Sequence, residues 1–182
     1  MRYGGVTFLR GACMSVAEKG WWGPRIWRIL HSLAEINDRV DVGPAWRQAL
    51  NLTADILPCV VCREHFRTRV RSIAFPIGVS NYASLRRTLW AIHAGTKASD
   101  VGAEAFPEEQ LATEYGGVSR EIIITRVIGL VTEVITAFSE NSVLDRLHAA
   151  SLTPWHRAMT HLINLLRWPQ PPAPGRRRGV RR

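Results

Sequence analysis

The chain has 182 residues, of which 46% are hydrophobic and 21% are charged, a composition typical of a folded globular protein with a core. Its longest apolar stretch, Ile122 to Phe138, is interrupted by Arg126 and Glu133 and falls short of the roughly 20 residues of a membrane span, so we expect none. The formal charge of +9 drops to +4 without the five arginines of residues 169–182, so charge alone does not define a nucleic-acid-binding protein.

Residues 1–20 are predicted to form a flexible N-terminal arm, with glycines at positions 4, 5, 11 and 20. The apolar stretch Gly4 to Leu9 is shorter than the roughly 7–15 residues of a secretion signal and ends at Arg10, so we expect an intracellular protein. Cys13 lies in this arm. It is either a free thiol or a cysteine that shuttles electrons or links two subunits.

Two helices are predicted next, each from an apolar stripe with helical spacing. The first opens with Trp21-Trp22-Gly23-Pro24, which places Pro24 at the first helical position. His31 follows Trp27 by one turn, so both can face the same side. The second helix runs from Pro44 to about Ile56. The stripes are Ile26, Trp27, Leu30, Leu33 and Ala34 in the first helix, and Trp46, Leu50, Ala54 and Leu57 in the second.

The third predicted helix carries the motif Leu57-Pro58-Cys59-x-x-Cys62. Two residues between the cysteines let the sulfurs meet in the first turn of a helix, and a proline is tolerated just before such a turn. The helix N-terminus stabilises a thiolate and makes the sulfur nucleophilic. Positive charge is added by Arg63, Arg67 and Arg69. We interpret Cys59 and Cys62 as a redox-active pair.

Two other interpretations of this motif stay open. In one, the two cysteines are ligands of a structural zinc site, and His65, His31 or His93 complete the ligand set. In the other, the two cysteines have no chemical role.

The fourth predicted helix runs from about Asn81 to Ala94, after the break at Phe75-Pro76-Ile77-Gly78. Asn81 is a suitable N-cap. Its core stripe is Leu85, Leu89 and Ile92, with Trp90 and His93 close by. The following segment, Ala94 to Gly117, is predicted to hold a short helix around Pro107 to Glu114.

Two more helices are predicted at Ser119 to Phe138 and at Pro154 to Arg167. Their apolar faces are broad and must be buried, either on the first four helices or on a second subunit. No strand pattern competes with this all-α prediction. Residues 169–182 are predicted to be a disordered tail, whose arginines are either simply solvated or form a nucleic-acid-binding or nuclear-targeting arm.

Three separated pieces together resemble the Erv/ALR family of FAD-dependent sulfhydryl oxidases, over about residues 20–117. The pieces are Trp22-Gly23-Pro24-x-x-Trp27-x-x-x-His31-Ser32-Leu33-Ala34, then Leu57-Pro58-Cys59-x-x-Cys62-x-x-His65-Phe66, then Leu89-Trp90-x-x-His93. Each piece is short, and it is their order and spacing in a helical chain that carry the resemblance.

The resemblance implies a four-helix bundle over residues 21–118 that holds FAD beside the C-x-x-C, with residues 119–168 as an additional helical region. It implies that Cys62 lies next to the flavin and that a substrate thiolate attacks Cys59. The implied cofactor residues are Trp22, Gly23, Trp27, His31, Trp90, His93, Lys97 and Tyr115. The competing interpretation is that the tryptophans and histidines among them are ordinary core residues.

The sequence departs from the family pattern in two places. The family commonly continues its last motif as His-Asn-x-Val-Asn, whereas this chain has His93-Ala94-Gly95-Thr96-Lys97. Two asparagines that would bind the nucleotide are therefore replaced, and Lys97 is left to contact a phosphate. The family's additional shuttle C-x-x-C is also missing, which favours direct acceptance of substrate thiols.

The function that the resemblance implies is oxidation of protein dithiols to disulfides, with O2 as electron acceptor and H2O2 as product, without a metal. The broad apolar faces after residue 118 favour a homodimer. The implied location is the cytoplasm or nucleus of an infected host cell for a viral member, and the mitochondrial intermembrane space for a cellular one. The alternative is a redox-inactive structural or interaction protein on the same helical fold.

Overall fold

The computed structural model describes residues 16–39, 41–72, 82–97 and 107–169. Within these ranges the chain forms helices and no strand, so the all-α prediction is confirmed. The helices are α1 (Lys19–Glu35), α2 (Gly43–Ile56), α3 (Val60–Ser72), α4 (Tyr82–Lys97), α5 (Gln110–Tyr115), α6 (Arg120–Glu140), α7 (Arg146–Ala149) and α8 (Leu152–Arg167).

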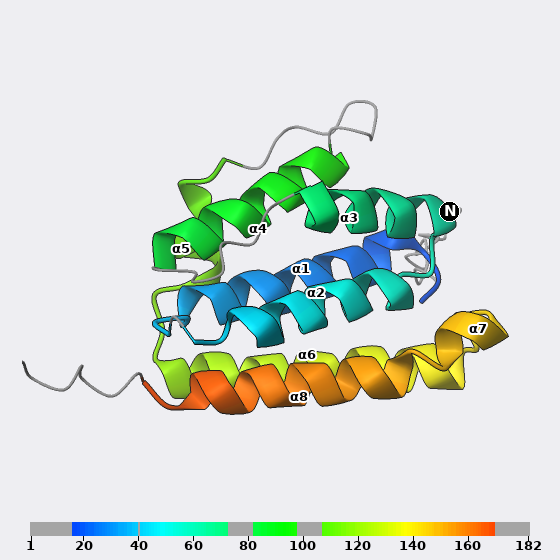
Figure 1. Cartoon of the computed structure of the whole chain (residues 1–182). Coiled ribbons are helices and arrows are strands. Elements are labelled where there is room, and N and C mark those ends of the chain that lie inside the picture. Colours follow the sequence, from blue (N-terminus) through cyan, green and yellow to red (C-terminus); the bar gives the residue numbers. More distant parts are fainter. Residues whose placement is uncertain (1–15, 40, 73–81, 98–106, 170–182) are drawn as a thin grey trace, which may run out of the picture.

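The helices are arranged in three layers (Figure 1). α1 packs against α4 on one side and α6 on the other, and α2 packs against α3 on one side and α8 on the other. α1 and α2 therefore form a middle layer between the α3–α4 pair and the α6–α8 pair. The buried apolar side chains of the three layers form one continuous cluster, so residues 21–118 and 119–168 share a single core.

The start of α1 differs from the sequence-based prediction. The helix begins at Lys19, and Pro24 lies inside it rather than at its first position. A proline inside a helix removes one hydrogen bond and usually kinks or breaks the helix. Here the side chains on either side of Pro24, Trp22 and Ile26, are buried in the core, and their packing outweighs this loss.

The broad apolar faces of α6 and α8 are covered within the chain. Val127, Val134, Trp155 and Met159 are all buried. The indole N–H of Trp155 on α8 donates a 3.0 Å hydrogen bond to the hydroxyl of Thr53 on α2. The sequence left two possibilities, that these faces pack on the first four helices or on a second subunit, and the structure shows the first. The homodimer stays a prediction, but burial of these faces is no longer an argument for it.

α6 is the one helix among the described residues that is long and apolar enough to cross a membrane, judged by length and composition. A core helix of a soluble protein passes the same test, and 33% of the apolar window of α6 is buried inside the fold. The expectation of no membrane span stays a prediction.

Several sequence-based predictions fall outside the described residues. They concern the arm with Cys13, the helix break at residues 75–78, the cap Asn81 and the basic tail after Pro169. The backbone of Lys97 belongs to α4, but its side chain is not among those described.

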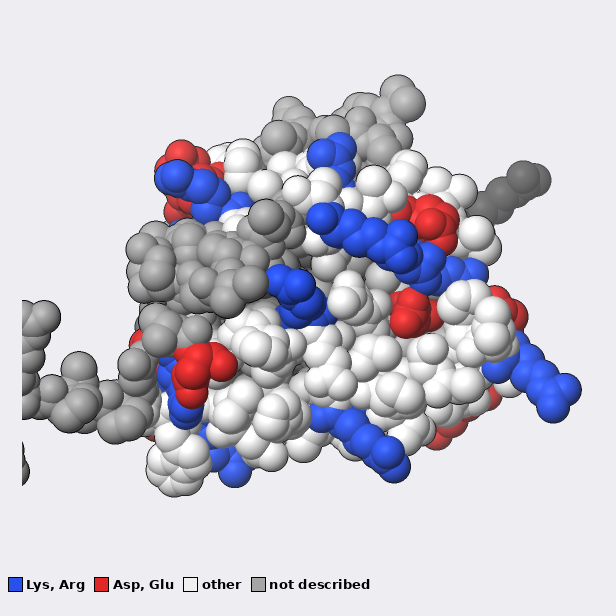
Figure 2. All heavy atoms as spheres, in the orientation of Figure 1, with Lys and Arg blue, Asp and Glu red and all other residues white. Residues whose placement is uncertain are grey.

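Charged side chains of both signs are spread over the face seen in Figure 2, where Lys and Arg lie among Asp and Glu. Several charges among the described residues are paired, among them Arg25 with Glu133 and Arg120 with Asp38. On this face no single basic patch stands out among the described residues, in keeping with the modest charge of the chain without its tail.

Candidate functional site

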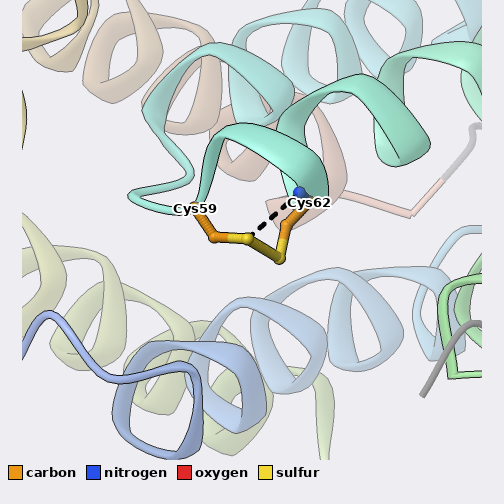
Figure 3. Close-up of a disulfide and its surroundings, with 2 residues drawn as sticks. All are labelled: Cys59 and Cys62. Carbon is orange, nitrogen blue, oxygen red and sulfur yellow. Dashed lines mark hydrogen bonds between the residues drawn. A yellow bond between two sulfur atoms is a disulfide. The ribbon is translucent and has the colours of Figure 1, made fainter. Parts of the chain in front are cut away.

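Cys59 and Cys62 form a disulfide at the start of α3 (Figure 3). Cys59 immediately precedes the helix, and its sulfur accepts a 3.1 Å hydrogen bond from the backbone N–H of Cys62. This is the place at which a side chain caps a helix N-terminus. In the reduced pair the same N–H would stabilise a Cys59 thiolate. The local fold therefore suits redox chemistry at this pair.

The disulfide lies on the wall of a cavity of about 870 Å³ between α1, α3, α4 and α5. This volume is within the range of roughly 300–1,000 Å³ typical of small-molecule and cofactor sites. Both cysteines take part in the lining, which is mainly apolar and aromatic. The lining residues are Lys19, Gly20, Trp22, Gly23, Pro24, Ile26, Trp27, Arg28, Leu57, Cys59, Val61, Cys62, His65, Phe66, His93, Glu114 and Tyr115.

Four aromatic rings form two stacked pairs at this cavity. Trp27 and His93 are nearly parallel, with ring centroids 4.0 Å apart, and His31 stacks on Tyr115 at 4.9 Å. Trp27 also contacts His31 at 5.6 Å, which links the two stacked pairs. The rings come from α1, α4 and α5 and offer flat apolar walls. A planar aromatic ligand is the kind of molecule that such walls bind.

His31 and His93 form a buried pair, with Nε2 of His31 3.0 Å from Nδ1 of His93. Burial, and then the positive charge of Arg86, lower the pKa of His31 to about 4. His31 is therefore neutral near pH 7. One ring nitrogen donates the hydrogen bond and the other accepts it, so the two nitrogens that face each other are satisfied.

The cavity wall also carries polar and charged groups. Trp22 is buried, and its indole N–H has no hydrogen-bond partner among the described residues. The carbonyl of Gly20 receives no helical N–H, because Pro24 stands four residues later. Lys19 and Arg28 add positive charge, although Arg28 also pairs with Glu114 at 2.6 Å. Together they offer a donor, an acceptor and cations.

The structure brings most of the predicted site residues together. Five predicted cofactor residues line the cavity with both cysteines: Trp22, Gly23, Trp27, His93 and Tyr115. His31 lies behind the wall, against His93. Trp90 on α4 is half-buried and is not among the lining residues. The side chain of Lys97 is not described.

Sequence reasoning missed Lys19, Gly20, Arg28 and Glu114 as parts of the cavity wall. Three of them had a signal, because residues 19, 20, 23, 24, 27 and 28 follow one another at the spacing of one helix face. The late predicted start of the first helix hid this face. Glu114 had no such signal, since its place depends on how α5 packs against α1.

The arginines after the C-x-x-C carry less free charge than the sequence indicated. Arg67 pairs with Asp55 at 2.8 Å and also with Glu64. Arg63 is buried and lies 3.7 Å from the carboxylate of Asp145. The positive charges of Arg63 and Arg67 are thus at least partly compensated.

The zinc interpretation finds no ligand set in the described part of the chain. No group of three or more His, Cys, Asp or Glu side chains there is placed to hold a metal ion. Of the histidines considered as ligands, His31 and His93 bond to each other, and His65 is exposed on the cavity wall.

A comparison with models of protein families finds no match for this chain, and searches of curated proteins and of solved structures find none either.

Proposed function

We propose that the chain is an FAD-dependent thiol oxidase that forms disulfides in protein dithiols, passes the electrons to O2 and releases H2O2. The observation that carries the proposal is that the Cys59–Cys62 disulfide and the predicted cofactor residues Trp27, His93 and Tyr115 belong to the wall of one cavity. In this proposal α1 to α4 are the four-helix bundle of the sulfhydryl oxidases, and α6 to α8 are an addition to it.

The residues present fit FAD. A stack of aromatic rings suits a flavin or an adenine, and Lys19 and Arg28 suit the two phosphates. The unpaired N–H of Trp22 and the carbonyl of Gly20 are a donor and an acceptor for ring heteroatoms. When bound, the flavin supplies the acceptor for the electron pair and its transfer to O2.

The reaction of the chain's own residues begins at Cys59. A substrate thiolate attacks its sulfur, a mixed disulfide forms, and the S–S bond to Cys62 breaks with Cys62 leaving as a thiolate. A second substrate thiolate then attacks the substrate sulfur of the mixed disulfide. Cys59 leaves as a thiolate, stabilised by the N–H of Cys62. The substrate is now oxidised, and Cys59 and Cys62 hold two electrons.

Both cysteines are half-buried, and the residues between them are exposed: Val60 by 64% and Val61 by 62%. A protein substrate can therefore reach the turn from solvent, and the cavity that both cysteines line holds the cofactor. His31, which is neutral and bonded to His93, fixes the orientation of the rings around it rather than supplying protons.

The test is the visible absorption spectrum of the purified chain, together with oxygen consumption on a small dithiol. The proposal expects a flavin absorption band and oxygen uptake that yields H2O2. A colourless protein that gains no flavin on incubation with FAD and consumes no oxygen would refute it. That result would favour a structural or interaction protein on the same helical fold.

A further inference from the structure

Arg63 is a buried cation one helical turn after Cys59. The residue is 5% exposed, and its backbone N–H donates to the carbonyl of Cys59 at 2.9 Å. Residues four apart on a helix are neighbours, and a helical side chain leans toward the preceding turn. The Arg63 side chain therefore extends back toward the turn that holds Cys59. Because a guanidinium stays protonated, it is a permanent positive charge there.

The ion-pair partner of Arg63 is distant from it in the sequence. Asp145 precedes α7, and its carboxylate lies 3.7 Å from the Arg63 guanidinium. The same carboxylate accepts the backbone N–H groups of Leu147 and His148, both at 3.0 Å. Its Oδ2 also contacts the His148 ring at 2.7 Å. One exposed carboxylate thus connects the C-terminal helices to the redox turn.

Other charged or titratable side chains also lie near this turn, on α3 or on the cavity wall that both cysteines share. Glu64 and Asp55 both pair with Arg67, one turn further along α3. Lys19 and His65 are on the cavity wall. Among the described residues, Asp145 is the acid that forms an ion pair with Arg63.

We propose that Arg63 sets the reduction potential of the Cys59–Cys62 pair and that the C-terminal helices tune it through Asp145. A positive charge stabilises the thiolate form of the reduced pair and does not act on the neutral disulfide, so it favours reduction. Asp145 offsets part of this charge and favours the disulfide. This inference rests on redox activity of the pair, as the proposed function does, but not on flavin or oxygen.

The test equilibrates the protein, without flavin and without oxygen, in glutathione buffers at about pH 8, near the ordinary pKa of a thiol. The reaction is protein disulfide plus two glutathione thiols giving protein dithiol plus glutathione disulfide, read by thiol trapping and mass spectrometry. Asp145→Asn should favour the dithiol by about three- to tenfold, where tenfold is about 30 mV for this couple. Asparagine still caps α7.

Arg63→Met should shift the same equilibrium the other way, toward the disulfide, by a similar factor. The opposite signs are the decisive result. If the ion pair were only a structural anchor, both substitutions would loosen the turn and shift the equilibrium in the same direction, which would overturn the proposal. No shift in either variant would also overturn it.

Two controls sharpen the result. Arg63→Lys keeps the charge and should stay within about twofold of the parent, since it is charge rather than shape that acts here. Asp38→Asn removes the partner of Arg120, at 2.8 Å, beyond the end of α1 that is remote from the cavity, and should leave the equilibrium unchanged. A chain that never binds flavin would refute the oxidase but leave this measurement intact.

Discussion

The two sides of the α1–α2 layer are built differently. On the α6–α8 side the apolar side chains close over each other, and the buried indole N–H of Trp155 has its acceptor in Thr53. On the α3–α4 side a cavity of about 870 Å³ stays open, and the indole N–H of Trp22 on its wall has no partner among the described residues. Interiors are normally close-packed and buried donors are normally paired. The first side is close-packed, and the second leaves the cavity that we propose holds the cofactor.

The largest effect should come from the disulfide itself. Cys62→Ser removes the sulfur expected next to the flavin, so thiol oxidation should fall by roughly a thousandfold or more. The aromatic stack is untouched and serine is close to cysteine in size, so the flavin absorption band should remain. The measurement is oxygen consumption with a dithiol, normalised to bound flavin. Full activity in this variant would refute the role given to Cys62.

A pair of tryptophan substitutions separates the two sides. Trp155→Ala, in the closed layer, should lower the free energy of unfolding by about 3–5 kcal/mol, because it leaves a cavity in the core and removes the hydrogen bond from the indole to Thr53. Trp27→Ala, at the half-buried stack, should cost about 2 kcal/mol, since less apolar area is lost. Flavin binding should respond in the reverse order.

Urea unfolding and flavin titration measure both quantities. Trp155→Ala, assayed below its unfolding transition, should keep the flavin affinity of the parent, whereas Trp27→Ala should lose it. Equal stability losses with unchanged flavin affinity in both variants would mean that Trp27 is an ordinary core residue.

The sequence predicted the helices well because their apolar stripes are long and regular. Leu85, Leu89 and Ile92 in α4, and Val127 and Val134 in α6, are buried as their spacing indicated. The start of α1 was predicted too late because Pro24 is a start signal only when packing does not override it. α7 was not predicted, since four residues are too few for a periodic pattern.

The site was predicted where a short motif carried it and missed where packing made it. Trp27, His93 and both cysteines stand in motifs, and they share one cavity. The Arg63–Asp145 ion pair joins residues 82 positions apart, and nothing local to either residue indicates the other. The bond between His31 and His93 likewise depends on how α1 meets α4.

The buried His31 should make the stability of the fold sensitive to acid. The pKa of His31 is about 4 in the folded chain, against 6.5 for an exposed histidine, because of burial and then Arg86. The unfolded chain therefore binds a proton between these values and the folded chain does not. The free energy of unfolding is therefore unaffected by the titration of His31 above pH 6.5. It falls as the pH falls from 6.5 toward 4, by about 2 kcal/mol at pH 5.

Urea unfolding at pH 7 and pH 5 measures this loss, and His31→Gln provides the comparison because it cannot titrate. The variant should be less stable at pH 7 and should show a smaller drop between the two pH values. An equal drop in parent and variant would assign the acid sensitivity to other groups.

The smallest effect should come from the exposed pair that closes the cavity rim, Arg28 and Glu114. Both side chains are about half exposed, so Glu114→Gln should cost less than about 1 kcal/mol of stability. It also removes a negative charge from the cavity wall and frees Arg28 for the phosphates of FAD. Flavin affinity should rise by about two- to fivefold at low salt and return toward the parent value at high salt.

Glu109→Gln, an equal change of charge beside the same short helix but away from the cavity, should have no such effect. A fall in affinity on Glu114→Gln would instead mean that the pair matters by holding α5, and with it Tyr115, against His31.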